Sequence, residues 1–241
     1  MISATNLSKN YGDFLAVDDL TFTVGKGEIV GLLGPNGAGK TTTLRMLAGI
    51  HPPTKGTVEI AGISMLNEPV AAKQQLAFMP DEPRLFDYLT VDEHLQFTAR
   101  LYNVTDWRSA AGTLLSELEL GDKRNALPFE LSRGMKQKLM IACGLLHAPR
   151  VMIFDEPLTG LDPLGIRKMK STIRQRAEGG ASVVLSSHLL PLVEELCDSI
   201  LVIHRGRRLA FGTIAHIKAM SRSGSDASLE DLFLEITAPE Q

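Results

Sequence analysis

The sequence predicts an α/β fold built around a largely parallel β-sheet, and three observations carry this prediction. Short apolar runs typical of strands alternate with segments that have a helical pattern. The strand runs are almost continuously apolar, as expected of strands whose sheet is covered on both faces. A glycine-rich stretch, GPNGAGKTT at 34–42, lies between one apolar run and the next helical segment. Alternating strands and helices are typical of parallel strands joined by right-handed crossovers.

Seven segments make up the alternating pattern. The predicted strands are GEIVGLLG at 27–34, VMIFDEP at 151–157, ASVVLSSH at 181–188 and ILVIHRG at 200–206. The predicted helices are TTTLRMLAGI at 41–50, RKMKSTIRQRA at 167–177 and LLPLVEELCDS at 189–199.

The middle of the chain, from about Leu85 to His147, lacks such strand-like runs and is predicted to be mainly helical. Thr90 and Glu93 have the spacing of a capping box, in which hydroxyl and carboxylate each accept a backbone N–H at the start of a helix. LTVDEHLQFTARLYN at 89–103 is therefore predicted to be a helix. The economical interpretation is a helical subdomain at about 85–147, inserted into a unit that spans 1–220.

The end of the chain, 221–241, is predicted to be a linker followed by a helical tail. SRSGSDAS at 221–228 has the composition of a flexible linker. In LEDLFLEI at 229–236, four apolar residues fall on one helical face, which indicates a short docking helix. These residues are Leu229, Leu232, Phe233 and Ile236.

Composition and charge restrict the classes of function. The chain has 241 residues, of which 44% are hydrophobic, enough for a sizeable globular core. The formal net charge is -3, so no global positive field indicates nucleic acid, and we expect no nucleic-acid partner.

Neither a membrane span nor a secretory signal is visible. The longest uninterrupted apolar run, LMIACGLL at 139–146, is far shorter than the roughly 20 residues that cross a bilayer. Cys143 and Cys197 lack CxxC spacing, which fits a reducing cytosol, and we expect both to be inert and mostly buried thiols.

The glycine-rich stretch has the spacing of a phosphate-binding loop. Gly34, Gly39, Lys40 and Thr41 satisfy the pattern G-x-x-x-x-G-K-[ST] between a predicted strand and a predicted helix. Glycines allow backbone N–H groups to surround phosphate oxygens, and the helix presents its positive N-terminal end. Lys40 adds positive charge at the β and γ phosphates, and Thr41 offers a hydroxyl to Mg²⁺. The other interpretation is a glycine-rich turn with a solvated lysine.

A second element strengthens the nucleotide hypothesis. VMIFDEP ends a predicted strand with two adjacent carboxylates. Asp155, at the carboxyl end of the strand, can hold Mg²⁺ through water, and Glu156 can polarise a water that attacks the γ phosphate. Alone, such a pair after a strand is more often a helix N-cap. Together with the loop, it predicts nucleotide hydrolysis.

Between these two elements, LSRGMKQK at 131–138 resembles the LSGGQ signature of the ATP-binding cassette (ABC) ATPases. The hydroxyl of Ser132 and the amide of Gly134 can point at an anion from the N-terminus of a helix. In the family, that anion is the γ phosphate held by the loop of a partner subunit, so two copies close head to tail over two ATP molecules. The alternative role of Ser132 as a simple N-cap is compatible with this one.

The resemblance extends from Tyr11 to the tail of the chain. It implies a P-loop NTPase (RecA-like) core with a mostly parallel sheet, a small N-terminal antiparallel β region and an inserted helical subdomain. It also implies a role for the remaining loop residues in binding ATP. These are Asn36, Gly37, Ala38 and Thr42.

Three further residues match family positions. Tyr11 in NYGDFLAVDDLTF matches the aromatic residue that stacks on adenine, although without this alignment it is interpreted as a core or strand residue. Asp162 in LTGLDP matches the loop that crosses the dimer interface. His188 in VLSSHLL matches the histidine that contacts the γ phosphate and helps to position the water.

The chain departs from the family pattern at two places. Arg133 and Met135 stand in the signature where the commonest form has Gly and Gln. After LAFMP, the family usually has a glutamine that senses Mg²⁺ and couples to the membrane partner, whereas this chain has Asp81 followed by Glu82. A carboxylate can still reach Mg²⁺ or its water, so Asp81 remains a candidate metal ligand.

The variant motifs look most like those of exporter cassettes whose membrane subunit is a separate polypeptide. The resemblance thus implies an ATPase at the cytoplasmic face of the membrane, with a membrane-spanning subunit and a second cassette, in a homodimer, as partners. Three residues stand where the family forms a groove for a coupling helix, although packing of the helical subdomain also explains them. They are Phe86, Tyr88 and Leu89.

Two other functions stay open at this point. A soluble ABC ATPase acting on ribosomes or chromosomes usually has two fused cassettes or long coiled-coil insertions, and neither is visible in this sequence. A P-loop GTPase or small-molecule kinase lacks support because no NKxD motif for guanine is found.

Overall fold

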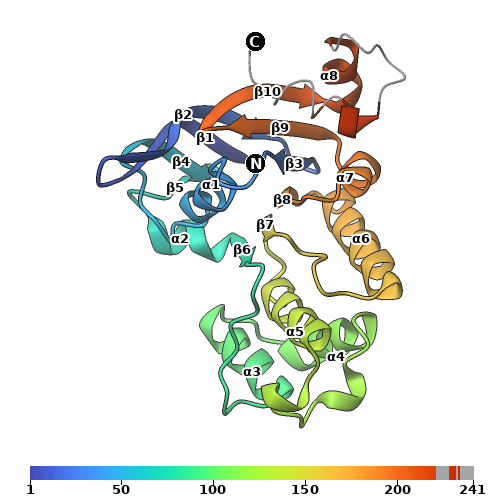
Figure 1. Cartoon of the computed structure of the whole chain (residues 1–241). Coiled ribbons are helices and arrows are strands. Elements are labelled where there is room, and N and C mark those ends of the chain that lie inside the picture. The colour runs from blue at the N-terminus through green and yellow to red at the C-terminus, as the bar shows by residue number, and fades with distance from the viewer. Residues whose placement is uncertain (221–227, 232, 234–241) are drawn as a thin grey trace.

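The computed structural model describes residues 1–220, 228–231 and 233, and contains two β-sheets with helices around them (Figure 1). The larger sheet has six strands in the order β10-β9-β3-β8-β7-β6. Its strands are β3 (Ile29–Leu33), β6 (Leu76–Met79), β7 (Val151–Asp155), β8 (Ser182–Ser186), β9 (Ser199–His204) and β10 (Arg207–Thr213). All neighbouring pairs are parallel except β10 with β9, so the predicted, mostly parallel α/β sheet is confirmed.

The smaller sheet has four antiparallel strands in the order β2-β1-β4-β5. They are β1 (Ile2–Tyr11), β2 (Phe14–Val24), β4 (Lys55–Ile60) and β5 (Ile63–Ser64). This sheet confirms the small antiparallel β region that the family resemblance implied near the N-terminus.

Eight α-helices with described bounds accompany the sheets, and the described residues 229–231 are also helical. The eight helices are α1 (Lys40–Leu47), α2 (Pro69–Gln74), α3 (Val91–Leu101), α4 (Trp107–Glu117), α5 (Arg133–Leu145), α6 (Pro163–Glu178), α7 (Leu190–Leu196) and α8 (Ile214–Met220). Short 3-10 helices cover Gly121–Lys123 and Pro128–Glu130. The predicted capping box is present at the start of α3, where Thr90 and Glu93 accept each other's backbone N–H.

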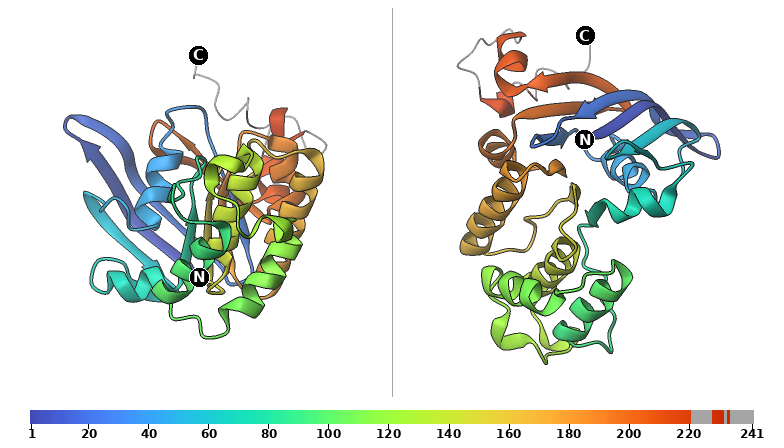
Figure 2. Two further views of the ribbon diagram at one scale, coloured as in Figure 1. Left: turned by 90° about the horizontal axis from the view of Figure 1, so that it is seen from below. Right: turned by 180° about the vertical axis from the view of Figure 1, so that it is seen from behind.

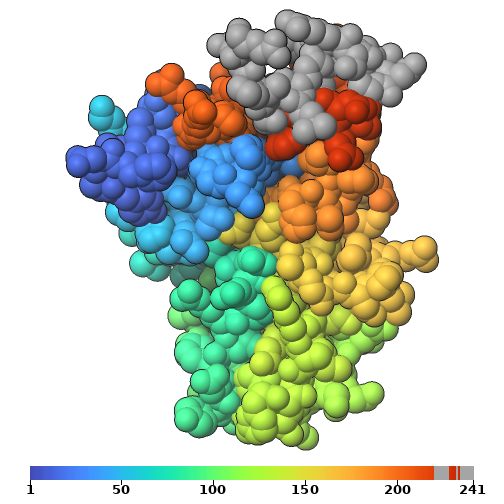
Figure 3. All heavy atoms as spheres, viewed as in Figure 1, coloured from blue at the N-terminus to red at the C-terminus, as the bar shows by residue number. Residues whose placement is uncertain are grey.

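Helices α3, α4 and α5 lie together at the end of the molecule away from β1, β2 and β10, as the front view (Figure 1) and the rear view (Figure 2, right) both show. They form the green lower part of the space-filling view (Figure 3). Their apolar side chains share one hydrophobic core with α6, α7 and one face of the larger sheet.

The pleat of the larger sheet distributes its side chains between two cores. In β3, Ile29 and Leu33 point into the core that contains the helices α3 to α7, whereas Val30 and Leu32 point into a second core with β1, β2 and α1. Residues two apart along a strand face the same side. Both faces are therefore covered, which explains why the strand runs are continuously apolar.

The thiols and the tail agree with the sequence where the structure describes them. Burial raises the pKa of Cys143 to about 11 and that of Cys197 to about 12, and both are free. Leu229 is buried in the core with helices α3 to α7, and Phe233 packs against it. The predicted linker, apart from Ser228, and the predicted contacts of Leu232 and Ile236 lie outside the described residues.

Candidate functional site

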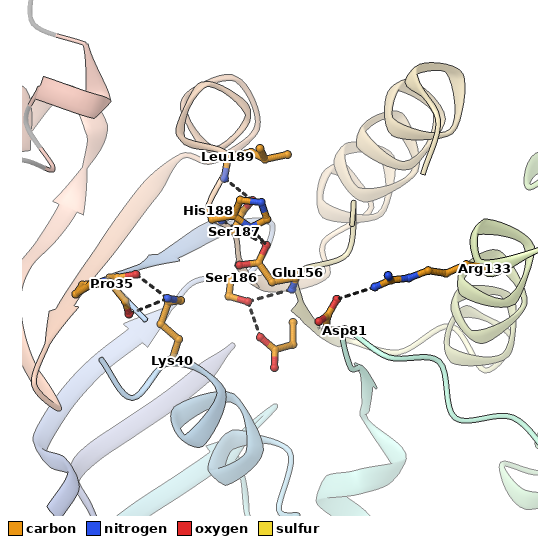
Figure 4. Close-up of polar contacts among 11 residues, drawn as sticks. Pro35, Lys40, Asp81, Arg133, Glu156, Ser186, Ser187, His188 and Leu189 are labelled. Carbon is orange, nitrogen blue, oxygen red and sulfur yellow. Dashed lines mark hydrogen bonds and ion pairs between the residues drawn. The ribbon is translucent and has the colours of Figure 1, made fainter. Parts of the chain in front are cut away.

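The phosphate loop connects β3, a central strand of the larger sheet, with α1. Lys40 begins α1, and its Nζ donates hydrogen bonds to the carbonyl oxygens of Gly34 at 2.6 Å and Pro35 at 3.1 Å (Figure 4). Gly39 caps the helix with φ of 102°, a left-handed conformation that favours glycine. The loop therefore curls around the ammonium group of Lys40.

Two glycines of the motif have no room for a side chain. A Cβ at Gly34 would lie 2.3 Å from the carbonyl oxygen of Ile203 in β9, and one at Gly39 would lie 2.6 Å from the carbonyl oxygen of Ala16. The loop thus passes directly against the backbone of neighbouring strands. The glycines serve this close approach as well as the binding of a ligand.

The loop lines a pocket of about 340 Å³. Its walls bring together most of the residues that the motif and the carboxylate strand predicted. The lining residues are Phe14 and Ala16, which were not predicted, and Asn36, Gly37, Ala38, Gly39, Lys40, Thr41, Thr42, Asp155 and Glu156. Partial burial lowers the pKa of Lys40, and the negative charges of Glu156 and Asp155 oppose that shift. The pocket therefore combines one ammonium group with two carboxylates.

Asp155 ends β7 and Glu156 follows it, and a buried serine of β8 connects them. Ser186 donates a hydrogen bond to Asp155 Oδ1 at 2.7 Å and accepts one from the backbone N–H of Glu156 at 3.0 Å. Asp155 and Ser186 are cross-strand partners in the parallel β7–β8 pair. Ser186 is fully buried, so its hydroxyl fixes the end of β7 in a single orientation.

Glu156 and His188 meet at the edge of this network. Glu156 Oε2 lies 2.8 Å from His188 Nδ1, as Figure 4 shows. The backbone of Glu156 has φ of 51°, the left-handed region that costs free energy for a residue with a side chain. That conformation turns its carboxylate from the end of the strand toward His188 and the pocket.

The signature residue Ser132 and the residue Asp162 lie outside the phosphate-loop pocket, each at the start of a helix. Ser132 caps α5 by accepting a hydrogen bond from the N–H of Met135 at 3.2 Å, and Asp162 caps α6 by accepting one from Gly165 at 2.9 Å. A Cβ at Gly134 would lie 3.2 Å from the carbonyl oxygen of Gly160, so the first turn of α5 touches the loop that leads to Asp162. None of the signature residues lines the phosphate-loop pocket.

Tyr11 also lies outside that pocket, whereas Phe14, its cross-strand partner, lines it. The Tyr11 ring meets His51 edge-on with centroids 6.1 Å apart, and Lys9 Nζ lies 5.3 Å from its centroid. The ring is 45% exposed. The assignment of Tyr11 to adenine stays a prediction.

A second pocket of about 550 Å³ adjoins the first, because Thr41 and Asp155 line both. Asp81 also lines this second pocket, and its carboxylate faces Arg133 of α5 (Figure 4). Thr41 and three carboxylate residues, Asp81, Glu82 and Asp155, thus border one space. In the part of the chain that the structure describes, no group of three or more His, Cys, Asp and Glu gathers as a metal site. This donor set fits Mg²⁺, which usually takes one or two carboxylates and completes its shell with phosphate and water.

The sequence of this chain matches a known family over the same elements. Residues 17–159 match the family described as ABC transporter, and this stretch holds the phosphate loop, the signature and the carboxylate strand. The chain belongs to the ABC transporter family. The resemblance inferred from the LSRGM signature is thereby confirmed.

Two proteins of this family are similar to the chain over most of its length. EcsA, an ABC-type transporter ATP-binding protein of Bacillus subtilis, is 36% identical over 98% of this chain and 96% of its own length. The Nod factor export ATP-binding protein I of Burkholderia orbicola is 38% identical over 93% of this chain and 74% of its own.

The cassette fold is confirmed by a solved structure. The structure of an ATP-binding subunit of an ABC transporter superposes with a TM-score of 0.94 and 36% identity, covering 98% of this chain and 99% of that one. Among the described residues, no helix is both long enough and apolar enough to cross a membrane.

Proposed function

We propose that this chain is the ATP-binding and ATP-hydrolysing subunit of an ABC transporter and powers export through a separate membrane-spanning subunit. The observation that carries the proposal is the 2.8 Å contact between Glu156 and His188. Glu156 lines the same pocket as Lys40, so an oriented carboxylate and a phosphate-binding cation border one space. Such a pair is what hydrolysis of a bound nucleotide requires.

ATP suits this pocket on charge and backbone geometry. The loop residues present N–H groups at the start of α1, where the helix dipole favours negative charge. Lys40 Nζ already has the loop carbonyls as partners and can add phosphate oxygens, because an ammonium group has three donors. Thr41 and Asp155, with Asp81 from the adjoining pocket, would hold Mg²⁺. Bound there, Mg²⁺ would neutralise charge on the β and γ phosphates.

Hydrolysis follows from the position of Glu156. A water attacks the γ phosphorus, the bond to the β–γ bridging oxygen breaks, and ADP and inorganic phosphate leave. The Glu156 carboxylate accepts a hydrogen bond from this water and receives its proton. His188 donates from Nδ1 to the Glu156 carboxylate, which has only acceptor atoms when ionised. His188 thus holds the carboxylate in one orientation.

Two copies would complete the site. Ser132, Gly134 and Asp162 lie at the exposed starts of α5 and α6, outside their own chain's phosphate pocket. Placed head to tail, each copy presents the N–H groups of its signature to the γ phosphate held by the other. ATP bound between the copies then shifts the population toward a closed homodimer, and product release reopens it.

The membrane subunit would dock on the segment between β6 and α3. Tyr88 is 92% exposed and Phe86 is 54% exposed, although both are large and apolar. The backbone N–H of Phe86 donates to Nε2 of the buried His94, 2.9 Å away, which ties this segment to α3. An apolar segment held on a polar anchor suits a helix of a partner. We place the chain at the inner face of the membrane through this contact, and export follows the named role of the Nod factor relative.

The ATPase assignment is tested with Glu156→Gln, which preserves size and the strained backbone but removes the base. We expect ATP hydrolysis to fall by at least about 100-fold while binding of ATP is retained. Light scattering with ATP and Mg²⁺ should then detect a stable dimer. Glu59→Gln, an exposed site on β4 with the same change of charge, is the matched control. Hydrolysis at the unchanged rate in Glu156→Gln would remove Glu156 from the reaction.

The transport assignment needs a separate experiment. The Glu156→Gln chain, tagged and loaded with ATP and Mg²⁺, is used to capture partners from detergent-solubilised membranes of the source cells. We expect a multi-spanning membrane protein, identified by mass, and its loss when Phe86 and Tyr88 are both changed to Ala. Recovery of ribosomes or chromosomal proteins would instead assign the same ATPase to a different task.

A further inference from the structure

The two departures from the family pattern lie against each other in space. Asp81 follows β6, and Arg133 is the first residue of α5, 52 positions later by the numbering of the two residues. Arg133 Nη2 lies 4.0 Å from Asp81 Oδ1, and Figure 4 shows the two side chains extended toward each other. The family's usual Gln and Gly at these positions cannot form an ion pair. This chain therefore has opposite charges on the two sides of this contact.

Arg133 is held in place by a neighbouring loop. A Cβ at Gly160 would lie 3.2 Å from Arg133 Nε and 3.3 Å from Cδ, so the arginine stem covers this glycine. Gly160 has φ of 80°. The stem thus rests on the loop that leads to Asp162, while the guanidinium group reaches toward the end of β6. This support directs the positive charge toward Asp81.

Asp81 has a carboxylate oxygen with unused bonding capacity. Oδ1 is inaccessible to solvent and has no hydrogen-bond partner among the described residues, because 4.0 Å to Arg133 is too long for a hydrogen bond. A carboxylate oxygen left without a donor is costly and favours a cation beside it. The same side chain lines the pocket that Thr41 and Asp155 share. Asp81 thus has a guanidinium group on one side and the proposed magnesium site on the other.

We propose that Arg133 is a positioning residue that competes with Mg²⁺ for the carboxylate of Asp81. This proposal rests on the function proposed above. When Mg²⁺ and ATP enter, Asp81 exchanges the guanidinium group for the metal, and the start of α5 loses a tether to the end of β6. The start of α5, which the signature residue Ser132 caps, is then freed from the end of β6 when the nucleotide pocket is occupied.

The contact between Arg133 and Asp81 is weak enough for Mg²⁺ to replace the arginine. The side chains of Arg133 and Asp81 are 61% and 45% exposed as wholes, although Asp81 Oδ1 itself is covered, so water around the guanidinium group screens their attraction. An exposed pair of this kind changes an equilibrium by a few-fold at most. A buried pair would instead hold Asp81 too firmly for Mg²⁺ to displace the arginine.

The test measures the Mg²⁺ concentration needed for half-maximal binding of a fluorescent, non-hydrolysable ATP analogue. Arg133→Gln should lower this concentration by about three-fold, because Mg²⁺ no longer competes with the guanidinium group. Asp81→Asn should raise it, and Arg133→Gln should have no further effect in the Asp81→Asn chain. Lys138→Gln is the matched control, since Lys138 lies on the same helix but pairs with Glu119 at 3.3 Å.

Each other outcome has a distinct meaning. An equal Mg²⁺ requirement in Arg133→Gln and Lys138→Gln would overturn the competition, as would additive effects of Arg133→Gln and Asp81→Asn. No analogue binding by the unchanged chain at any Mg²⁺ concentration would overturn the proposed ATPase function itself. The melting temperatures of Arg133→Gln and Asp81→Asn are expected to be equal. Measuring them separates a loss of folding from a loss of competition.

Discussion

The phosphate loop at 34–42 and the facing contact between Asp81 and Arg133 border adjoining pockets but are built in opposite ways. The phosphate loop is held by backbone that leaves no room for a side chain at Gly34 or Gly39. The second region is held by exposed side chains of opposite charge, 4.0 Å apart. The first region follows the family pattern and the second departs from it.

This difference shows which parts of such a site can change. A close backbone approach accepts almost no substitution, because any Cβ displaces a neighbouring strand. An exposed ion pair contributes little to folding, so its residues can be exchanged for others at low cost. We therefore expect the residues that tune the response to the ligand at the exposed contact. We expect the residues that bind the phosphates in the loop.

Gly34→Ala is the change with the largest expected effect. Its Cβ would meet the carbonyl oxygen of Ile203 at 2.3 Å, so β3 or β9 has to shift. We expect roughly 3 kcal/mol of lost folding free energy and no detectable ATP binding. Denaturant unfolding and nucleotide binding measure the two effects. Gly121→Ala, where no atom lies within 4 Å of the new Cβ, is the control, and equal stability of both variants would contradict the steric argument.

Ser186→Ala breaks the side-chain part of the rigid region without a steric clash. It removes the donor to Asp155 Oδ1 and the acceptor of the Glu156 N–H, both in a buried place. Loss of such a hydrogen bond costs about 1–3 kcal/mol. We expect a stability loss of this size and a lower turnover number, because Glu156 is no longer fixed. Ser171→Ala, on the exposed side of α6, serves as the control; a Ser186→Ala enzyme with normal turnover would show that the hydroxyl is dispensable.

Tyr11→Ala and Phe14→Ala, at the outer edge of the phosphate-loop pocket, show which of the two rings contacts the base of ATP. They have the smallest expected effect on ATP binding. Phe14 lines the pocket that the phosphate loop shapes, so we expect phosphates rather than the base to lie beside it. Base stacking on an aromatic ring contributes about 1–3 kcal/mol. We expect Tyr11→Ala to weaken ATP binding by about ten-fold and Phe14→Ala by less than about three-fold. Titration with ATP and with inorganic triphosphate separates base from phosphate binding, and the reverse order would assign the adenine to Phe14.

The fold and the rigid part of the site could be predicted because their signals are local. The seven alternating segments correspond to strands and helices of the structure, and Thr90 with Glu93 marks the start of α3 correctly. The G-x-x-x-x-G-K-T spacing indicated a loop that the structure holds through close backbone contacts. In each case a pattern within a few consecutive residues is enough to predict the element, although the contacts that hold the loop come from Ile203 and Ala16, far away in the sequence.

Two features could not be predicted, since they depend on pairing between distant segments. Ser186 is one of two serines before His188, and only the alignment of β7 with β8 places its hydroxyl between Asp155 and Glu156. The register of two parallel strands cannot be determined from the sequence of either strand alone. The contact of Arg133 with Asp81 likewise requires that α5 begins beside the end of β6. The sequence signal available was only that both positions depart from the same family pattern.

The strand order of the larger sheet separates the two regions mechanically. β3, which carries the phosphate loop, is bonded to β8 on one side and β9 on the other, whereas β6, which leads to Asp81, ends the sheet and is bonded to β7 alone. Moving the end of β3 requires two ladders of hydrogen bonds to open, and moving the end of β6 requires one. Amide protons near Asp81 should therefore exchange with deuterium long before those of β3. We therefore expect the cassette to be more flexible near the proposed partner contacts beyond β6 than at the proposed phosphate-binding loop after β3.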